Sequence, residues 1–340
     1  MDSDLLRPSP EGLYCPPGDF HIDPQFPVHR AVITHAHGDH AYPGSRTYHA
    51  ASAGTGLLRD RLGSEATIRA HDYGAPFELG DAKVSLHPSG HMLGSAQVRI
   101  EALGRVAVVS GDYKRDADPT CAPFEPVPCD VFVTESTFAL PIYRWPPIAQ
   151  VIEEILAWIE ECTTRGMAAV LFCYALGKAQ RLLAELATRT QRTAYVHGAM
   201  LPLIQRYREA GVAMLPTEAV REAGRGREYA GELVLAPPSA AGSAWMRRFG
   251  HASTAFASGW MQVRGARRRR GYDRGFVVSD HADWPGLLAS VRDCGAKRIY
   301  VTHGDGEALV RYLRDEGHDA HPLHALGNAM PSAPRSEEGD

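Results

Sequence analysis

The chain has 340 residues, 44% of them hydrophobic and 22% charged, with 33 glycines and 24 prolines. This profile predicts a globular α/β protein of one large or two moderate domains. The net charge of −4 argues against a generic nucleic-acid binder, so an anionic substrate would have to meet a local basic patch. There is no signal-like N-terminus, no apolar run near the roughly 18 residues of a membrane span, and no CxxC pair among the six cysteines. A cytoplasmic location is therefore expected.

Short strands are expected first, at residues 30–34, 83–87, 97–100, 106–109 and 131–134. Helices follow at 148–162 and 178–186, on either side of a strand at 168–173. Strands at 275–279 and 298–302 then return to the earlier pattern, in which a strand is followed by a histidine. The simplest organisation is one domain interrupted by another. Residues 1–140 and 271–328 would form the first, residues 141–270 the insert, and residues 329–340 a disordered tail.

A dense group of candidate metal ligands, His35-Ala36-His37-Gly38-Asp39-His40, directly follows the strand at 30–34. Alternate side chains of an extended chain share a face, so His35, His37 and Asp39 can converge while His40 approaches from another direction. Three imidazoles and one carboxylate suit divalent zinc, with manganese as the second choice. A histidine-rich surface loop is the alternative, but the fixed pattern after a strand favours metal binding.

Further candidate ligands stand at the ends of other predicted strands. His91 follows a strand and a glycine turn, and Asp112 and His303 each end an apolar strand. One such residue alone would more often be a cap or turn residue. Their recurrence beside the first motif predicts that all three bind metal.

These motifs resemble those of a known superfamily. HAHGDH, GHMLGS, SGDYK and VTHGD are similar to the metal motifs of metallo-β-lactamase-fold hydrolases. Glu135, His281 and the segment Gly177-Lys178-Ala179-Gln180 resemble features of the β-CASP nucleases, and the whole chain resembles the bacterial DNA-ligase-associated exonucleases. The resemblance implies an αββα metallo-β-lactamase sandwich, formed by residues 1–140 and 271–328, with an α/β β-CASP domain inserted at residues 141–270.

The resemblance also implies a ligand set. His35, His37 and His91 would hold one metal, Asp39, His40 and His303 the second, and Asp112 would bridge the two. Asp23 would orient the HAHGDH loop, the alternative being an ordinary aspartate at a strand end. Asp39, Glu135 and His281 are the expected catalytic residues.

The ligand motifs are typical of the fold and not of one substrate, but Glu135, His281 and the inserted domain imply, through the β-CASP resemblance, a mechanism that cleaves phosphodiesters. Two cations about 3.5 to 4 Å apart can share a hydroxide that attacks phosphorus. His281, oriented by Glu135, would protonate the departing sugar oxygen. A structural histidine and a strand-end salt bridge are the respective alternatives for these two residues.

The expected substrate is DNA, cut exonucleolytically during repair. Lys178 at a helix start and the run Arg267, Arg268, Arg269 and Arg270 are candidate phosphate contacts, although such a run is often a solvated loop. An ATP-dependent DNA ligase and a helicase are the partners implied by the resemblance. Three alternatives stay open: an RNA-processing nuclease, which His303 favours, a small-molecule metallo-hydrolase, and a scaffold that binds nucleic acid without cutting it.

Overall fold

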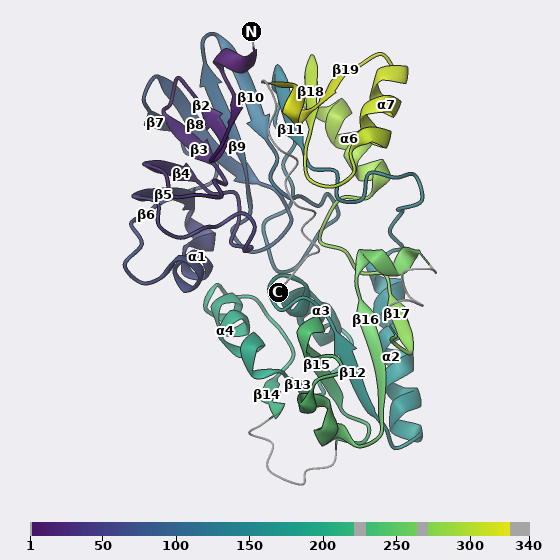
Figure 1. Cartoon of the computed structure of the whole chain (residues 1–340). Helices are drawn as coiled ribbons and strands as arrows, with labels where there is room; N and C mark the ends of the chain where they lie inside the picture. The colour runs from purple at the N-terminus through teal and green to yellow at the C-terminus, as the bar shows by residue number, and fades with distance from the viewer. Residues whose placement is uncertain (1, 221–228, 264–270, 327–340) are drawn as a thin grey trace. The chain divides into compact units, whose positions relative to one another are not determined.

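A computed structural model describes residues 2–220, 229–263 and 271–326 (Figure 1). These residues divide into two compact units. The first unit combines residues 2–142 with residues 281–326, and the second comprises the described residues of Tyr143–Asp280. Every strand-end residue of the proposed metal site lies in the first unit.

The first sheet of this unit has six strands in sequence order. They are β1 (Arg7–Ser9), β2 (Gly12–Cys15), β3 (Phe20–Ile22), β4 (Arg30–Val32), β5 (Thr47–Ala51) and β6 (Ile68–His71). β1, β2 and β3 pair antiparallel, whereas β3 to β6 run parallel, with helix α1 (Thr55–Leu62) between β5 and β6. Since β3 and β4 are parallel neighbours, the residues that follow them emerge at the same edge of the sheet.

The second sheet draws strands from both ends of the chain, in the order β19-β18-β11-β10-β9-β8-β7. They are β7 (Phe77–Leu79), β8 (Ala82–Pro88), β9 (Ala96–Ala102), β10 (Arg105–Val109), β11 (Val131–Thr134), β18 (Arg298–Val301) and β19 (Asp319–Pro322). β10, β11, β18 and β19 run parallel, and β8 runs in the same direction because β9 is antiparallel to both β8 and β10. The carboxyl ends of β8, β10, β11 and β18 therefore meet at one edge.

The two sheets enclose a common core, and helices cover the far face of the second sheet. Alternation along β10 shows this division: Ala107 and Val109 join the core shared with the first sheet, and Val108 points to the other face. There it meets the buried faces of α6 (Trp284–Cys294) and α7 (Glu307–Asp315), which lie beside β18 and β19 in Figure 1. The start of α6 is capped by the Asp283 side chain, which accepts a hydrogen bond from Gly286 N at 2.9 Å.

The second unit is built on one six-stranded, fully parallel sheet, in the order β14-β13-β15-β12-β16-β17. Its strands are β12 (Ala168–Phe172), β13 (Ala194–Val196), β14 (Thr217–Ala219), β15 (Leu233–Ala236), β16 (Ala252–Ala257) and β17 (Arg274–Phe276). Helices α2 (Ile148–Thr164), α3 (Lys178–Ala187) and α4 (Leu201–Glu209) pack on one face, and an aromatic cluster including Phe172, Tyr195 and Phe256 covers the other. Burial on both faces explains the uninterrupted apolar sequence of β12.

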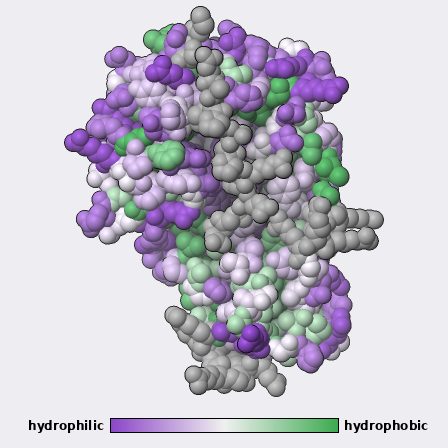
Figure 2. Space-filling model, viewed as in Figure 1, coloured by the Kyte–Doolittle hydropathy of each residue, from purple (hydrophilic) through white to green (hydrophobic). Residues whose placement is uncertain are grey.

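The structure confirms the expected α/β class and most of the predicted elements. The expected strand at 275–279 is wrong beyond Phe276, because β17 ends there and the chain turns toward α3. The expected disordered tail at 329–340 lies outside the described residues. Within the described residues, no helix has the length and apolarity to cross a membrane. On the face shown in Figure 2, hydrophobic residues form small areas among hydrophilic ones, as expected of a chain whose large apolar side chains are mostly buried.

Candidate metal centre

Strand ends place the candidate ligands together. Thr34 and His35 follow β4, and Asp23 follows β3, its parallel neighbour. In the second sheet, the loops after β8, β10, β11 and β18 carry four further candidates, namely His91, Asp112, Glu135 and His303. The topology thus explains how residues far apart in the sequence reach one site.

Three histidine nitrogens converge in this site. Nδ1 of His37 lies 3.1 Å from Nε2 of His35 and 3.1 Å from Nε2 of His91. Nitrogens bound to one tetrahedral zinc ion at ordinary bond lengths are about 3.3 Å apart. Together with Asp112, these rings form a group whose donor atoms all lie within 4.8 Å of one another. The spacing fits a divalent cation held between them.

The Asp23 carboxylate orients two of the histidines. Its Oδ2 atom accepts a hydrogen bond from Nδ1 of His40 at 2.7 Å and from the Thr34 hydroxyl at 2.6 Å. Because Thr34 donates its hydroxyl proton to Asp23, it accepts the bond from Nδ1 of His35, 3.0 Å away. Both imidazoles therefore carry their proton on Nδ1, and in the neutral rings Nε2 offers a lone pair, the form that binds metal.

The Nε2 atom of His40 provides a direct test of whether a cation fits. Among the residues that the structure describes, it has no hydrogen-bond partner, and it is buried. It lies 3.6 Å from Oδ2 of Asp112 and 3.7 Å from Oδ2 of Asp39. Burial acts to lower the pKa of His40, but Asp112 and Asp23 raise it to about 10. The carboxylates thus favour a positive charge at this nitrogen, which either a proton or a divalent cation can supply.

Asp112 lies between the candidate ligand sets. Its Oδ2 atom is 3.6 Å from Nε2 of His35, 3.6 Å from Nε2 of His40 and 3.8 Å from Nε2 of His91. Burial acts to raise the pKa of Asp112, but His40, His281 and other rings hold it well below its ordinary range. The carboxylate is therefore ionised and suitably placed to contact two cations.

Asp39 and His303 lie at the side of His40. The Asp39 side chain is 49% exposed, and the His303 ring stacks on that of His40 with centroids 5.0 Å apart. His303 adopts φ 51° and Asp23 φ 44°, a left-handed conformation that is unfavourable for side-chain-bearing residues. Strain at candidate functional positions is a common feature of active sites.

Glu135 and His281 form a hydrogen-bonded pair beside this group. Nδ1 of His281 donates to Oε2 of Glu135 at 2.9 Å, and Nε2 takes no part in this bond. Glu135 is only 1% exposed, and its carboxylate also accepts from Tyr113 N at 2.8 Å and from the Thr137 hydroxyl at 2.5 Å. The same His281 nitrogen lies 3.9 Å from Oδ2 of Asp112. The carboxylate therefore fixes both the ring orientation and its tautomer.

Thr34 and Thr137 also belong to the site, although no sequence motif indicates them. Their hydroxyls position Asp23, His35 and Glu135. Each adjoins or nearly adjoins a predicted site residue, and that adjacency was the only available indication. Of the candidate phosphate contacts, Lys178 is buried, with its ammonium 3.5 Å from Asp280. Arg267, Arg268, Arg269 and Arg270 lie outside the described residues.

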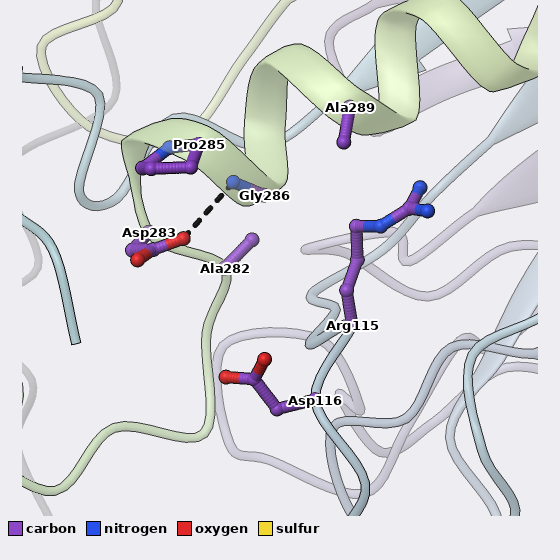
Figure 3. A pocket seen from close by; sticks show the side chains of 7 residues that line it. All are labelled: Arg115, Asp116, Ala282, Asp283, Pro285, Gly286 and Ala289. Carbon is purple, nitrogen blue, oxygen red and sulfur yellow. Dashed lines mark hydrogen bonds between the residues drawn. The ribbon is translucent and has the colours of Figure 1, made fainter. Parts of the chain in front are cut away.

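A cavity of about 280 Å³ opens at the start of α6 in the first unit (Figure 3). Figure 3 shows Asp283 and Gly286 at the helix start, with Arg115 and Asp116 on the adjoining loop. Arg115 is ion-paired with Asp293 at 2.5 Å. The lining includes none of the proposed metal ligands. This cavity therefore does not define the metal centre.

Comparisons with known proteins give related but partial matches. No protein-family model matches the chain. The chain is 33% identical over 316 residues to a probable DNA ligase of Opitutus terrae, a match covering 91% of this chain and 30% of that protein. It is 30% identical over 128 residues to endoribonuclease YSH1 of Gibberella zeae, a match covering 37% of this chain and 15% of that protein. The chain thus spans less than a third of the length of these curated relatives.

A solved structure gives a likeness in fold. It is a protein of unknown function from Enterococcus faecalis V583, with a TM-score of 0.56 and 11% sequence identity. The match covers 81% of this chain and 75% of that one. At this identity the likeness concerns the fold alone.

Proposed function

We propose that this chain is a metal-dependent phosphodiesterase of the metallo-β-lactamase fold with a β-CASP insert, acting on the DNA backbone as an exonuclease. The observation that carries the proposal is the meeting of His35, His37 and His91 with Asp112. Beside them lies a buried nitrogen of His40 that has no hydrogen-bond partner in the described part of the chain. Asp39 and His303 would complete a second ion site, with Asp112 between the two. Zinc is the first candidate ion and manganese the second.

The residues of the site have distinct proposed roles. Two bound cations would supply Lewis acidity and a positive charge opposite to that of the phosphodiester. Asp23 keeps His35 and His40 in their ligand tautomers. Asp39, beside His40, would help to hold the second cation. His281 would give a proton from Nε2 to the departing sugar oxygen, and Glu135 would stabilise the charged ring through Nδ1.

The comparisons support a nucleic-acid substrate, and their coverage favours DNA. The similarity to a probable DNA ligase extends over 91% of this chain, whereas the similarity to endoribonuclease YSH1 extends over 37%. A role beside an ATP-dependent ligase and a helicase in DNA repair, within the cytoplasm, belongs to the same proposal. RNA is the second candidate, supported by the endoribonuclease similarity and by His303. The arginines at 267–270 remain candidate contacts to the backbone.

Digestion of end-labelled oligonucleotides tests the proposal. Purified protein would be stripped of metal, reloaded with zinc or manganese, and incubated with single- and double-stranded DNA and with RNA of the same sequence. We expect a ladder of DNA products that requires metal and disappears in His37→Ala. Strong preference for RNA would replace the DNA assignment, and a ladder that survives His37→Ala would refute the site.

A further inference from the structure

Asp280, which immediately precedes His281 in the sequence, belongs to a buried group of three charged side chains. Asp280 is the last residue of the second unit, and its side chain is 5% exposed. Its Oδ2 atom lies 3.5 Å from Nζ of Lys178, and its Oδ1 atom lies 3.9 Å from Nη1 of Arg181. Lys178 and Arg181 are 5% and 3% exposed. Two cations and one anion are therefore enclosed together at the carboxyl ends of β12 and β17.

The first turn of α3 holds both cations in place. Gly177 adopts φ 86°, a conformation that is unfavourable for residues with a side chain. Its N–H donates to the Gln180 side chain at 2.7 Å. Gln180 also donates to Ala175 O at 2.9 Å, which closes the loop between β12 and α3. The Lys178 ammonium lies 4.8 Å from the centre of the Tyr174 ring. Lys178 and Arg181 are one helical turn apart and therefore face the same way.

Arg181 also binds the backbone of the segment that leads to His281. Its Nη1 donates to Ser279 O at 2.9 Å. Three residues further on, Ala282 N donates to Tyr113 O at 2.6 Å. The chain is thus tied down just before and just after His281. The two ties belong to different parts of the fold: Arg181 to α3, and Tyr113 to the loop that also carries Asp112.

Burying three charges is costly, and well-packed apolar residues often stabilise a fold equally well. We therefore explain this network by the backbone conformation that it fixes, and not by a gain in stability. It also makes Lys178 a poor contact for a substrate phosphate, because the ammonium is enclosed and already faces a carboxylate. Its distance from Asp280 points instead to a role in shaping the backbone.

We propose that Lys178, Arg181 and Asp280 are positioning residues that set the placement of His281 as proton donor to the leaving group. This inference rests on the proposed phosphodiesterase function. None of the three would touch substrate or metal. Their effect passes through the peptide of Ser279 and Asp280, so a misplacement of His281 by even about 1 Å would slow the step that needs its proton.

A leaving group that needs no proton separates this role from a general structural one. Wild-type products first identify which bridging oxygen departs. An oligodeoxynucleotide with sulfur at that position is then compared with ordinary DNA of the same sequence. The test variant is Lys178→Met with Asp280→Asn, which removes one positive and one negative charge together. The matched control is Arg189→Met, which breaks the exposed 3.1 Å pair between Arg189 and Glu153 in the same unit.

We expect the double variant to keep its metal content and to lose roughly 10- to 100-fold in kcat on ordinary DNA, within the range set by general acid catalysis. KM should change little, and the sulfur-bridged DNA should be cut at nearly the wild-type rate. His281→Ala should show the same pattern, and Arg189→Met should behave as wild type on both substrates. Should the double variant fail to fold, Arg181→Lys keeps the charge and should give a smaller loss with the same rescue by sulfur.

Other results overturn the inference. Equal losses on both substrates would indicate a structural role, unchanged kcat would indicate no role, and loss of metal would indicate an effect on the ligands. If wild-type protein cleaves neither substrate with any metal, the proposed function itself fails. If wild type cleaves both and the variants match it, only the positioning role is refuted.

Discussion

Asp23 is linked to His35 and His40 by hydrogen bonds through a single carboxylate oxygen. Its Oδ2 atom lies 2.7 Å from Nδ1 of His40 and reaches Nδ1 of His35 through the Thr34 hydroxyl. The two histidines are proposed ligands of different cations. One aspartate outside the proposed ligand set therefore controls the tautomer of a histidine in each proposed site.

Replacement of Asp23 by asparagine should weaken metal binding. Both oxygens of Asp23 are acceptors, Oδ1 from Thr34 N and Oδ2 from Nδ1 of His40, whereas asparagine keeps only one acceptor oxygen. One of these bonds would therefore be lost, and the charge that favours the proton on Nδ1 of His40 would be removed. We expect the affinity for zinc to fall about 10- to 100-fold, the usual cost of losing such a partner. Competition with a zinc-binding dye measures this affinity. Asp19→Asn is the control, because Asp19 also has a left-handed backbone, at φ 48°, but bonds to Tyr14. Equal affinities in wild type and Asp23→Asn would contradict the role of Asp23 in orienting the two histidines.

Metal content should depend separately on the two proposed ligand sets. We expect two divalent ions per wild-type chain, one in His37→Ala and neither firmly bound in Asp112→Asn, because the Asp112 oxygen lies 3.6 Å from ligand nitrogens of both sets. Elemental analysis after gel filtration gives the stoichiometry. His87→Ala is the control, because His87 lies in β8, ahead of His91, but bonds to Ser85 and Glu125. A full complement of metal in Asp112→Asn would contradict the bridging role.

Much of the local structure could be predicted from the sequence. The helix expected at 148–162 is α2 (Ile148–Thr164), and the strand expected at 131–134 is β11 (Val131–Thr134). Strong apolar periodicity or β-branched runs define such elements locally. Helices α6 and α7 were missed, since their apolar faces are short and are recognisable only against the sheet that they cover.

Some properties of the site depended on tertiary contacts that no sequence pattern specifies. The hydrogen bonds that link Asp23 to His35 through Thr34 depend on the register between β3 and β4, which brings Asp23 opposite the end of β4. The position of Lys178 at a helix start predicts a contact to phosphate, but its side chain is buried and lies 3.5 Å from Asp280, 102 positions later. Pairing across such separations is decided by the fold.

Acid should destabilise the metal-free protein partly through His49. Burial, together with the smaller effects of the neighbouring His71 and Arg69, lowers the pKa of His49 to about 4. Between about pH 6.5 and 4 the unfolded chain binds a proton at this residue that the folded chain excludes. The free energy of unfolding should therefore fall as the pH drops through this range, by at most about 1.4 kcal/mol per pH unit from this group.

Urea unfolding in the presence of a chelator, repeated across this pH range, measures the effect. His49→Gln removes the titrating group, so its unfolding free energy should fall less steeply than that of wild type below pH 6.5. The two curves should run parallel above pH 7, where the imidazole is neutral in both states. Parallel curves throughout would show that His49 is protonated as readily in the folded protein as in the unfolded chain.

Replacement of Gly111 should be costly, because two loops approach each other closely at this residue. Gly111 adopts φ 55°, and a Cβ atom there would lie 2.7 Å from Cβ of Thr34. Gly104 also has positive φ, at 69°, but a Cβ there would meet nothing within 4 Å. Gly104→Ala should therefore cost only the backbone strain, about 1 kcal/mol. Gly111→Ala should cost roughly 2 to 4 kcal/mol, because core contacts that are too close add to the same strain.

The two variants also separate stability from metal binding. Displacement of Thr34 breaks the bond chain from Asp23 to His35, so Gly111→Ala should bind zinc more weakly as well as unfold at lower urea concentration. Gly104→Ala lies in the turn between β9 and β10 and should keep the wild-type affinity. Equal losses of stability in both alanine variants, without loss of affinity in either, would contradict this prediction. The loop before Asp112 could then move without disturbing the ligands, so the contact between Gly111 and Thr34 would not constrain the site.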